Sequence, residues 1–314
     1  MKAKALVTGG CGFVGSHLAR RLTQDFEVVV LDNLSSGKRE NIADVQGKVK
    51  LIVGDVRDAT AVRKAIRGCS YVFHLAAQVS VENATKNPME DASVNITGTL
   101  NLLEHAKKCE KIIIYSSAAV YGEPIQTPIR EEHPRNPINM YGVSKLASET
   151  YAYTYHKIYG LPVTILRPFN IYGPGQRRES QYSGVITTFA EKIENGDAPV
   201  IHGDGTQTRD FVHVSDVVEA SILAAESEKA TGQTFNVGTG KATTINQLAN
   251  TMIKIVGKNL KPTHTKPRKG DIKHSVADIT KIQKTLGYKP KTTLTQGLKK
   301  TINMVKGTKT KRTI

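Results

Sequence analysis

The sequence has 314 residues, of which 39% are hydrophobic, and it carries a formal net charge of +16. The length suffices for one large domain or two interleaved ones, and no apolar run approaches the ~20 residues that cross a bilayer. The 3 cysteines are too few for a disulfide framework and suit a reducing cytoplasm. No cluster of Cys and His has the spacing of metal ligands. The composition therefore argues against a membrane-spanning or disulfide-stapled protein, and we expect a cytoplasmic one without a metal site.

Basic residues are dense in the C-terminal part, for example at Lys254, Lys258 and Lys261, and in a basic tail over residues 307–314. Such charge could attract nucleic acid or anionic substrates. Proteins that bind single strands need aromatic side chains on which bases stack, and none interleaves with these lysines. We therefore expect a solvated lysine-rich surface and no nucleic-acid partner.

The chain begins with an apolar strand at residues 5–8, a glycine-rich turn and an amphipathic helix at residues 14–24. Gly9 allows a sharp turn, Gly12 leaves room for a pyrophosphate at the helix N-terminus, and Gly15 lets the helix lie close to the sheet. Asp32 ends the next apolar run, about 20 residues later. A carboxylate there can bind both hydroxyls of an adenosine ribose and repels a 2′-phosphate. The pattern predicts a dinucleotide site that favours NAD over NADP.

Strand and helix patterns then alternate along the chain. We expect strands at residues 28–31, 49–53, 71–75, 111–116 and 163–167, and helices at residues 58–67, 90–108 and 139–158. This alternation predicts an α/β fold, a doubly wound parallel sheet of Rossmann type, over residues 1–167 with later returns near 208–240. Beyond residue 167 the pattern is less regular, with Gly- and Pro-rich joints. A smaller α/β substrate-binding lobe is expected from residues 168–207 and 241–306.

A tyrosine and a lysine lie four residues apart in the helix expected at residues 139–158. Tyr141 and Lys145 therefore share one helix face, and a lysine cation stabilises a phenolate, which brings tyrosine towards use as a base. Tyr153 and Lys157 have the same spacing, but only Tyr141 lies near the helix start, where the ends of the strands are expected. Ser117, just after a strand, is its candidate partner. We expect catalysis from Ser117, Tyr141 and Lys145.

These features together resemble the extended short-chain dehydrogenase/reductase family, and within it the nucleotide-sugar 4-epimerases. The resemblance covers nearly the whole chain. Its motifs are TGGCGFVG at residues 8–15, GDVR at 54–57, HLAA at 74–77, NITG at 95–98, SSAAVYG at 116–122, YGVSK at 141–145, RPFN at 167–170, TRDF at 208–211 and FNVGTG at 235–240.

The resemblance implies a role for each matching residue. Asp55 would hydrogen-bond the adenine, Ala76 and Ala77 would line the pyrophosphate and ribose, and Asn95 would lie near the nicotinamide. The same resemblance implies further cofactor contacts at Phe13, Val14, Asn33, Val56, Leu75, Ser116 and Phe169.

On the substrate side, the resemblance implies that Ser117 binds the sugar's O4, that Tyr141 is the base and that Lys145 also holds the nicotinamide ribose. The remaining substrate contacts that it implies are Asn170, Arg209 and Arg268 on the diphosphate, Asp271 on the ribose, and His202 and Ser275.

The residues after Ser117 indicate which reaction the family member performs. Dehydratases of the family carry Asp-Glu there, and the UDP-sugar decarboxylases carry a Glu, whereas this chain has Ala118 and Ala119. Alanine transfers no proton, so we expect only oxidation and re-reduction at one carbon. The leading expectation is a UDP-glucose/UDP-galactose 4-epimerase that uses NAD. The alternatives are the N-acetylated pair or both pairs, an NADPH-dependent keto-sugar reductase, and a non-enzymatic RNA-binding relative.

Three more positions bear on this resemblance. Val79 stands where the family often has a lysine near the cofactor phosphates, and Cys11, where Ala or Gly is commoner, is expected to be a buried structural thiol. Ser275 stands where a tyrosine narrows the sugar pocket in some relatives, so its small side chain predicts room for an N-acetyl group. The family also implies a homodimer built from the helices near 90–108 and 139–158, with Leu146, Tyr153 and Ile158 as candidate contacts.

Overall fold

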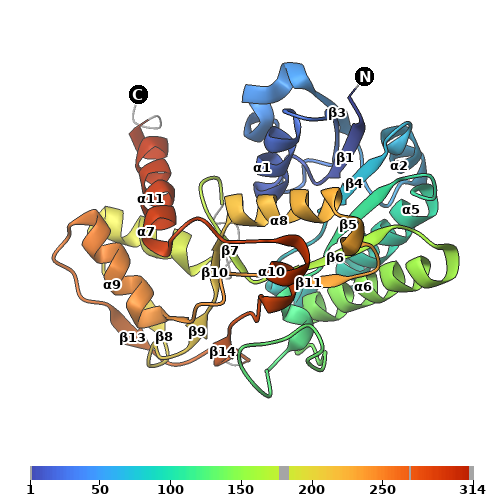
Figure 1. Ribbon diagram of the computed structural model, residues 1–314. Helices are drawn as coiled ribbons and strands as arrows, with labels where there is room; N and C mark the ends of the chain where they lie inside the picture. The colour runs from blue at the N-terminus through green and yellow to red at the C-terminus, as the bar shows by residue number, and fades with distance from the viewer. Residues whose placement is uncertain (1, 177–183, 269, 311–314) are drawn as a thin grey trace.

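A parallel sheet forms the centre of the protein. The computed structural model describes residues 2–176, 184–268 and 270–310 (Figure 1). Within these residues a seven-stranded sheet has the order β11-β6-β5-β4-β1-β2-β3, and every neighbouring pair is parallel. Its strands are β1 (Lys4–Thr8), β2 (Glu27–Asp32), β3 (Val49–Val53), β4 (Tyr71–His74), β5 (Lys111–Tyr115), β6 (Val163–Pro168) and β11 (Thr234–Val237). The strand order reverses between β1 and β4, which is where such sheets bind ligands.

Helices cover both faces of this sheet, as a doubly wound fold requires. α1 (Phe13–Leu22) and α8 (Val214–Glu226) pack together on one face, and α2 (Ala59–Ile66), α5 (Gly98–His105) and α6 (Met140–Tyr159) pack on the other (Figure 1). Successive strand residues point to opposite faces, so Val7 belongs to the core under α1 and α8, while Leu6 belongs to the core under α2 and α5. The predicted Rossmann-type sheet is confirmed.

The helix expected at residues 90–108 is divided. α3 (Val81–Lys86) and α4 (Pro88–Ala92) precede a π-helical turn at Ser93–Thr97, and α5 follows directly. Within this region the Asn95 carbonyl accepts the hydroxyls of Ser148, at 2.7 Å, and Thr99, at 2.6 Å. The wider turn thus joins this segment to α6, a tertiary bond that local periodicity does not encode.

The later part of the chain builds a smaller group of elements around its own core. Its strands pair as β7 (Asn170–Tyr172) with β10 (Phe211–His213), β8 (Val200–His202) with β13 (Thr263–Thr265), and β9 (Thr208–Arg209) with both β12 (Thr243–Thr244) and β14 (His274–Ser275). The helices α7 (Val185–Asn195), α9 (Ile245–Val256) and α11 (Leu294–Thr310) pack against one another, whereas α10 (Thr280–Leu286) packs against β11. α11 enters the basic tail, of which residues 311–314 lie outside the described residues. None of the helices in the described ranges is long and apolar enough to cross a membrane.

Gly122 fixes the segment between Ser117 and α6. It ends the 3₁₀ turn at Ala118–Tyr121 with φ 65° and ψ −142°. A Cβ at this position would lie 1.9 Å from the Asn136 carbonyl oxygen, whereas at Gly160, the C-cap of α6 with φ 68°, it would meet nothing within 4 Å. Gly122 therefore combines a backbone that disfavours side chains with a close approach that forbids them.

Replacing each glycine by alanine separates these two effects. Gly160→Ala should lower the free energy of unfolding by about 1–2 kcal/mol, the cost of the left-handed backbone alone. Gly122→Ala should lower it by more than about 3 kcal/mol, because steric overlap is added to backbone strain. Urea unfolding of the two variants checks this, and equal losses would mean that the contact with Asn136 relaxes without cost.

Candidate active site

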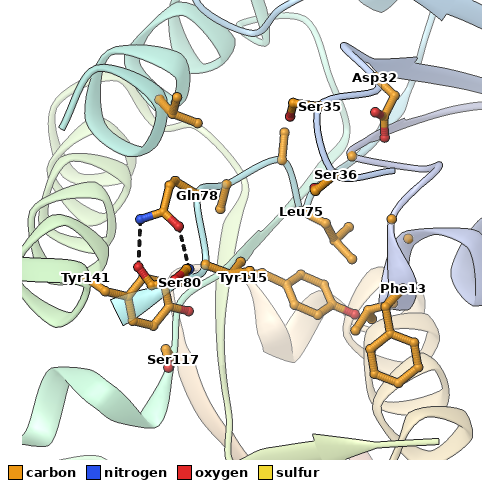
Figure 2. A pocket seen from close by; sticks show the side chains of 18 of the residues that line it. Phe13, Asp32, Ser35, Ser36, Leu75, Gln78, Ser80, Tyr115, Ser117 and Tyr141 are labelled. Carbon is orange, nitrogen blue, oxygen red and sulfur yellow. Dashed lines mark hydrogen bonds between the residues drawn. The ribbon is translucent and has the colours of Figure 1, made fainter. Parts of the chain in front are cut away.

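A cavity of about 900 Å³ opens at the carboxyl ends of the central strands. Figure 2 shows Tyr141 and Ser117 at one end of it and Asp32 and Phe13 at the other. The residues of the sequence prediction that line it are Gly9, Gly12, Phe13, Val14, Gly15, Asp32, Asn33, Val56, Leu75, Ala76, Ala77, Ser116, Ser117, Tyr141, Lys145, Phe169 and Asn170. Asp55, Asn95, His202, Arg209, Arg268, Asp271 and Ser275 do not line it.

The glycine-rich turn places the N-terminus of α1 against this cavity. No side chain caps the first turn of α1, so its N–H groups and the positive end of the helix dipole can receive an anion. At Gly15 a Cβ would lie 2.1 Å from the Gly9 carbonyl oxygen, which is the close packing that the motif predicted. Val79, which stands where the family often has a lysine, lines the cavity with 65% of its surface exposed. At the N-terminus of α1 the anion donors are therefore backbone N–H groups.

Asp32 is the last residue of β2 and is buried. Its Oδ2 accepts the N–H of Cys11, and its Oδ1 accepts the N–H of Leu34, both at 2.8 Å. Burial raises the pKa of this carboxyl, and the two N–H donors oppose that rise. An ionised carboxylate has about four acceptor sites, so both oxygens can still accept ligand hydroxyls. Cys11 is fully buried, and burial raises the pKa of its thiol to about 12, as expected of a structural cysteine.

Tyr141 and Ser117 meet at the opposite end. Tyr141 is the second residue of α6, which Asn139 caps by accepting the Gly142 N–H at 2.9 Å. Ser117 comes two residues after the end of β5, and it lines the same cavity as Tyr141 and opposes the rise in the pKa of the Tyr141 phenol. Lys145, one turn further along α6, is 7% exposed and lines the cavity. No hydrogen bond or ion pair joins its Nζ to any residue that the structure describes, so its donors are available to a ligand.

Burial shifts the pKa values of both titratable side chains of this set. Burial raises the pKa of Tyr141 above its ordinary value, Ser117 opposes this, and Asp91 adds to it. Lys145 is not among the groups that lower the pKa of Tyr141. Burial also lowers the pKa of Lys145 to about 8, although Asp91 and Glu149 raise it. Burial is thus the largest influence on both pKa values, and the stabilisation of the Tyr141 phenolate by Lys145 stays a prediction.

Asn95 acts within the protein rather than at the cavity wall. Its Oδ1 accepts the Gln78 N–H at 2.8 Å, and its Nδ2 lies 3.0 Å from the Gln78 carbonyl oxygen and 2.9 Å from Ser144 Oγ. These partners occupy the side-chain amide of Asn95, so the geometry does not favour a direct contact between this amide and a nicotinamide. Asn95 instead holds the cavity loop at Gln78 against α6.

Asp55 is likewise engaged by its neighbours. Its carboxylate accepts Nε and Nη2 of Arg57, at 2.9 and 2.8 Å, and Nδ2 of Asn33, at 2.9 Å. The Arg57 guanidinium holds the pKa of this carboxyl well below its usual range. Asp55 therefore positions Asn33 and Arg57, which line the cavity themselves.

The predicted substrate residues of the smaller lobe form a separate cluster. Arg209 pairs with Asp271 at 2.5 Å, and Arg268 contacts the His202 ring at 3.0 Å. Ser275 is buried on β14, in register with Arg209 on β9. The cluster connects to the cavity through Asn170, whose N–H donates to the carbonyl of Asp210. The structure thus brings Arg209, Asp271 and Ser275 together, beside rather than inside the described cavity.

Several residues of the site were missed by the sequence analysis. Gln78 lines the cavity and hydrogen-bonds Ser80 (Figure 2). Asp91 and Glu149 are buried carboxylates near Lys145. The sequence spacing could have indicated both carboxylates. Glu149 lies four residues after Lys145, as Lys145 does after Tyr141, and Asp91 lies four residues before Asn95.

Comparison with known proteins agrees with this arrangement. The family profile described as GDP-mannose 4,6 dehydratase matches residues 6–301. The chain belongs to this family. It is part of the NAD-dependent epimerase and dehydratase group of extended short-chain dehydrogenases/reductases, whose members act on nucleotide sugars.

Relatives within this family carry more than one activity. A putative UDP-glucose 4-epimerase of Methanocaldococcus jannaschii is 39% identical over 306 residues, which is 96% of this chain and 98% of the relative. The solved UDP-N-acetylglucosamine 4-epimerase of Methanobrevibacter ruminantium M1 has a TM-score of 0.93 at 37% identity, covering 98% of this chain and 100% of that one. The UDP-glucose 4-epimerase of Thermus thermophilus, solved with NAD, has a TM-score of 0.87 at 37% identity, covering 97% and 99%. More distant family members include UDP-glucuronate 4-epimerases and UDP-sugar decarboxylases.

Proposed function

We propose that this protein is an NAD-dependent 4-epimerase of a UDP-hexose, with UDP-glucose and UDP-galactose as the leading pair. The observation that carries the proposal is that Ser117, Tyr141 and the buried Lys145 line one end of the same cavity, and that Nζ of Lys145 has no partner among the described residues. Ala118 and Ala119 follow Ser117 directly. The positions that supply extra acids in dehydratases and decarboxylases thus hold no proton donor here, which favours epimerisation.

The residues of the cavity fit a dinucleotide of NAD type. The uncapped N-terminus of α1 suits the pyrophosphate, Asp32 suits the adenosine ribose, and Lys145 suits the second ribose. The carboxylate of Asp32 disfavours a 2′-phosphate, which argues against an NADPH-dependent reductase. When bound, NAD supplies a hydride acceptor at the sugar's C4 and a positive charge beside the phenol.

Tyr141 and Ser117 then handle the proton. Tyr141 Oη would take the proton of the sugar's 4-hydroxyl during oxidation at C4, and Ser117 Oγ would hold O4 and relay that proton. The 4-keto sugar would turn over in the cavity, and Tyr141 would return the proton to O4 when C4 is reduced from its other face. Lys145 favours the phenolate during this step and holds the ribose in place.

The substrate diphosphate suits the cluster of the smaller lobe. Arg209 and Arg268 offer the planar donors that bind phosphates in pairs, and Asn170 lies where the cluster meets the cavity. Asp271 and His202 pair with these arginines and so hold the two guanidinium groups in place. We assign the UDP moiety to this cluster.

Acid denaturation of the purified protein should release NAD(H), and the protein should interconvert UDP-glucose and UDP-galactose in an NMR assay. UDP-N-acetylglucosamine and UDP-glucuronate, tested separately, identify other substrates.

Tyr141→Phe should lower turnover by more than about 100-fold, because it removes the base. Tyr153→Phe is the matched control, since Tyr153 is exposed and its ring lies 5.3 Å from Nζ of Lys157. Equal activity of the two variants, or release of NADP(H) instead, would contradict the proposal.

The second candidate substrate is the N-acetylated pair. Ser275 is small and lies in register with Arg209, and a pocket of matching shape rejects a larger group by steric clash. We expect wild type to act on UDP-N-acetylglucosamine as well as UDP-glucose. Ser275→Tyr should suppress the first reaction at least about tenfold and spare the second, as measured by NMR. Activity on UDP-glucose with none on UDP-N-acetylglucosamine in wild type would overturn this argument.

The homodimer remains a prediction that follows from the family. Tyr153 and Ile158 are exposed on α6, at 44% and 66%, whereas Leu146 packs against the core of its own chain. Two of the three expected contacts are therefore accessible to a second copy. Light scattering at micromolar concentration should give about twice 34.3 kDa, and a monomeric mass would reject the dimer.

A further inference from the structure

Two buried carboxylates act on Lys145, and their surroundings differ. Glu149, 2% exposed, accepts Nε of Arg167 at 2.9 Å and also binds Nη2 of that residue. Arg135 adds a third contact at 3.0 Å, and the Ser116 hydroxyl donates to Oε2 at 2.8 Å. The negative charge of Glu149 is thus balanced by two arginines.

Asp91, also 2% exposed, has only neutral donors among the described residues. Its Oδ1 accepts from Gln78 Nε2 at 3.0 Å and from Asn95 Nδ2 at 3.1 Å. Burial raises the pKa of this carboxyl, and Ser144, Gln78 and Lys145 oppose that rise. No basic nitrogen of the described ranges lies within ion-pair distance of this carboxylate. Within the same ranges, the cation whose charge acts on Asp91 is Lys145. Burying a charge without a counter-charge is costly. A buried carboxylate such as Asp91 therefore needs a nearby positive charge, and Lys145 is the candidate.

The backbone places Asp91 beside the lysine. α4 packs against α6, and Asn95 Nδ2 lies within hydrogen-bond distance of both Asp91 Oδ1 and Ser144 Oγ. Ser144 directly precedes Lys145, and its hydroxyl also contacts the Tyr141 carbonyl at 3.1 Å. Asp91 is therefore fixed to the turn of α6 that carries the lysine.

We propose that Asp91 is the counter-ion of Lys145: held by Gln78 and Asn95, it keeps the lysine protonated while Nζ remains free to bind a ligand. It is a positioning residue, since it touches neither the cavity nor the reacting atoms. The link to catalysis rests on the proposed function, but the charge of Lys145 does not.

The other charged groups near Lys145 do not replace Asp91. Glu149 also raises the pKa of Lys145, but Arg167 and Arg135 offset its field. His74 on β4 is fully buried with its pKa lowered to about 3, first by burial and then by Lys145, so it is neutral near pH 7. Tyr141 is protonated there as well, because burial and Asp91 raise its pKa. Asp91 thus supports the lysine charge even though it opposes the phenolate.

Removing the charge of Asp91 tests this directly. Protein labelled with ¹³C at lysine Cε is titrated by NMR as purified, with Lys145→Arg identifying the signal. Asp91→Asn should move the Lys145 midpoint down by about one pH unit or more, because a nearby opposite charge is lost.

Glu82→Gln, which removes a carboxylate that pairs with Lys86 on the neighbouring α3, should leave the midpoint unchanged. Asp91→Ser repeats the neutralisation with a smaller side chain, should the asparagine amide disturb folding. An unchanged midpoint in both neutral variants overturns the proposal.

Turnover gives a second readout. In Asp91→Asn the alkaline limb of kcat should move to lower pH, and Asp91→Glu should restore it, whereas a purely structural defect would lower kcat equally at every pH. A shifted NMR midpoint in a protein that converts no UDP-sugar would reject the proposed function and leave the counter-ion intact. Turnover of a UDP-sugar together with an unshifted Lys145 midpoint would support the proposed function and reject Asp91 as the counter-ion.

Discussion

The ion pair between Glu149 and Arg167 is the interaction on which the site depends. Arg167 lies in β6, and Glu149 lies about two turns after Tyr141 on α6, so the pair fixes α6 to the sheet. Both side chains are almost fully buried, where losing one partner of a pair typically costs about 3–5 kcal/mol. The pair is further tied to Ser116, at the end of β5, through Glu149. The positions of Ser117, Tyr141 and Lys145 relative to one another thus follow from one buried contact.

A second buried carboxylate organises the smaller lobe in the same way. Asp210 is fully buried and accepts the N–H groups of Thr239 at 2.8 Å, Gly240 at 2.9 Å and Ala277 at 3.3 Å, and the Thr239 hydroxyl at 2.6 Å. These donors come from the segment after β11 and the segment after β14. Since Asp210 lies between Arg209 and Phe211, its carboxylate joins the cluster that carries Arg209 to the edge of the large sheet. Arg209 is thereby held beside a cavity that another part of the chain builds.

The sequence predicted the parts of the fold that local patterns determine. The strand at residues 49–53 was placed at its observed bounds, and the other predicted strands differ by at most one residue at each end, because apolar runs bounded by turns carry that information. The turn at Ser93–Thr97 and the role of Asn95 could not be read in this way, since both follow from hydrogen bonds to Ser148 and Gln78, which are distant in the chain. The sequence identified the residue types of the site, but their hydrogen-bond partners and burial emerged only from the packed structure.

Burial also bears on how Tyr141, a poor base in isolation, can act in the proposed reaction. The buried surroundings raise the pKa of Tyr141 and lower that of Lys145 to about 8, so they favour the neutral form of both side chains. In a cavity of low dielectric any added positive charge acts strongly on the phenol, and the free donors of Lys145 can bind the ligand that brings it. The desolvation that disfavours the phenolate thus also strengthens its response to a positive charge nearby. This property suits the proposed reaction, in which Tyr141 takes up a proton and then returns it.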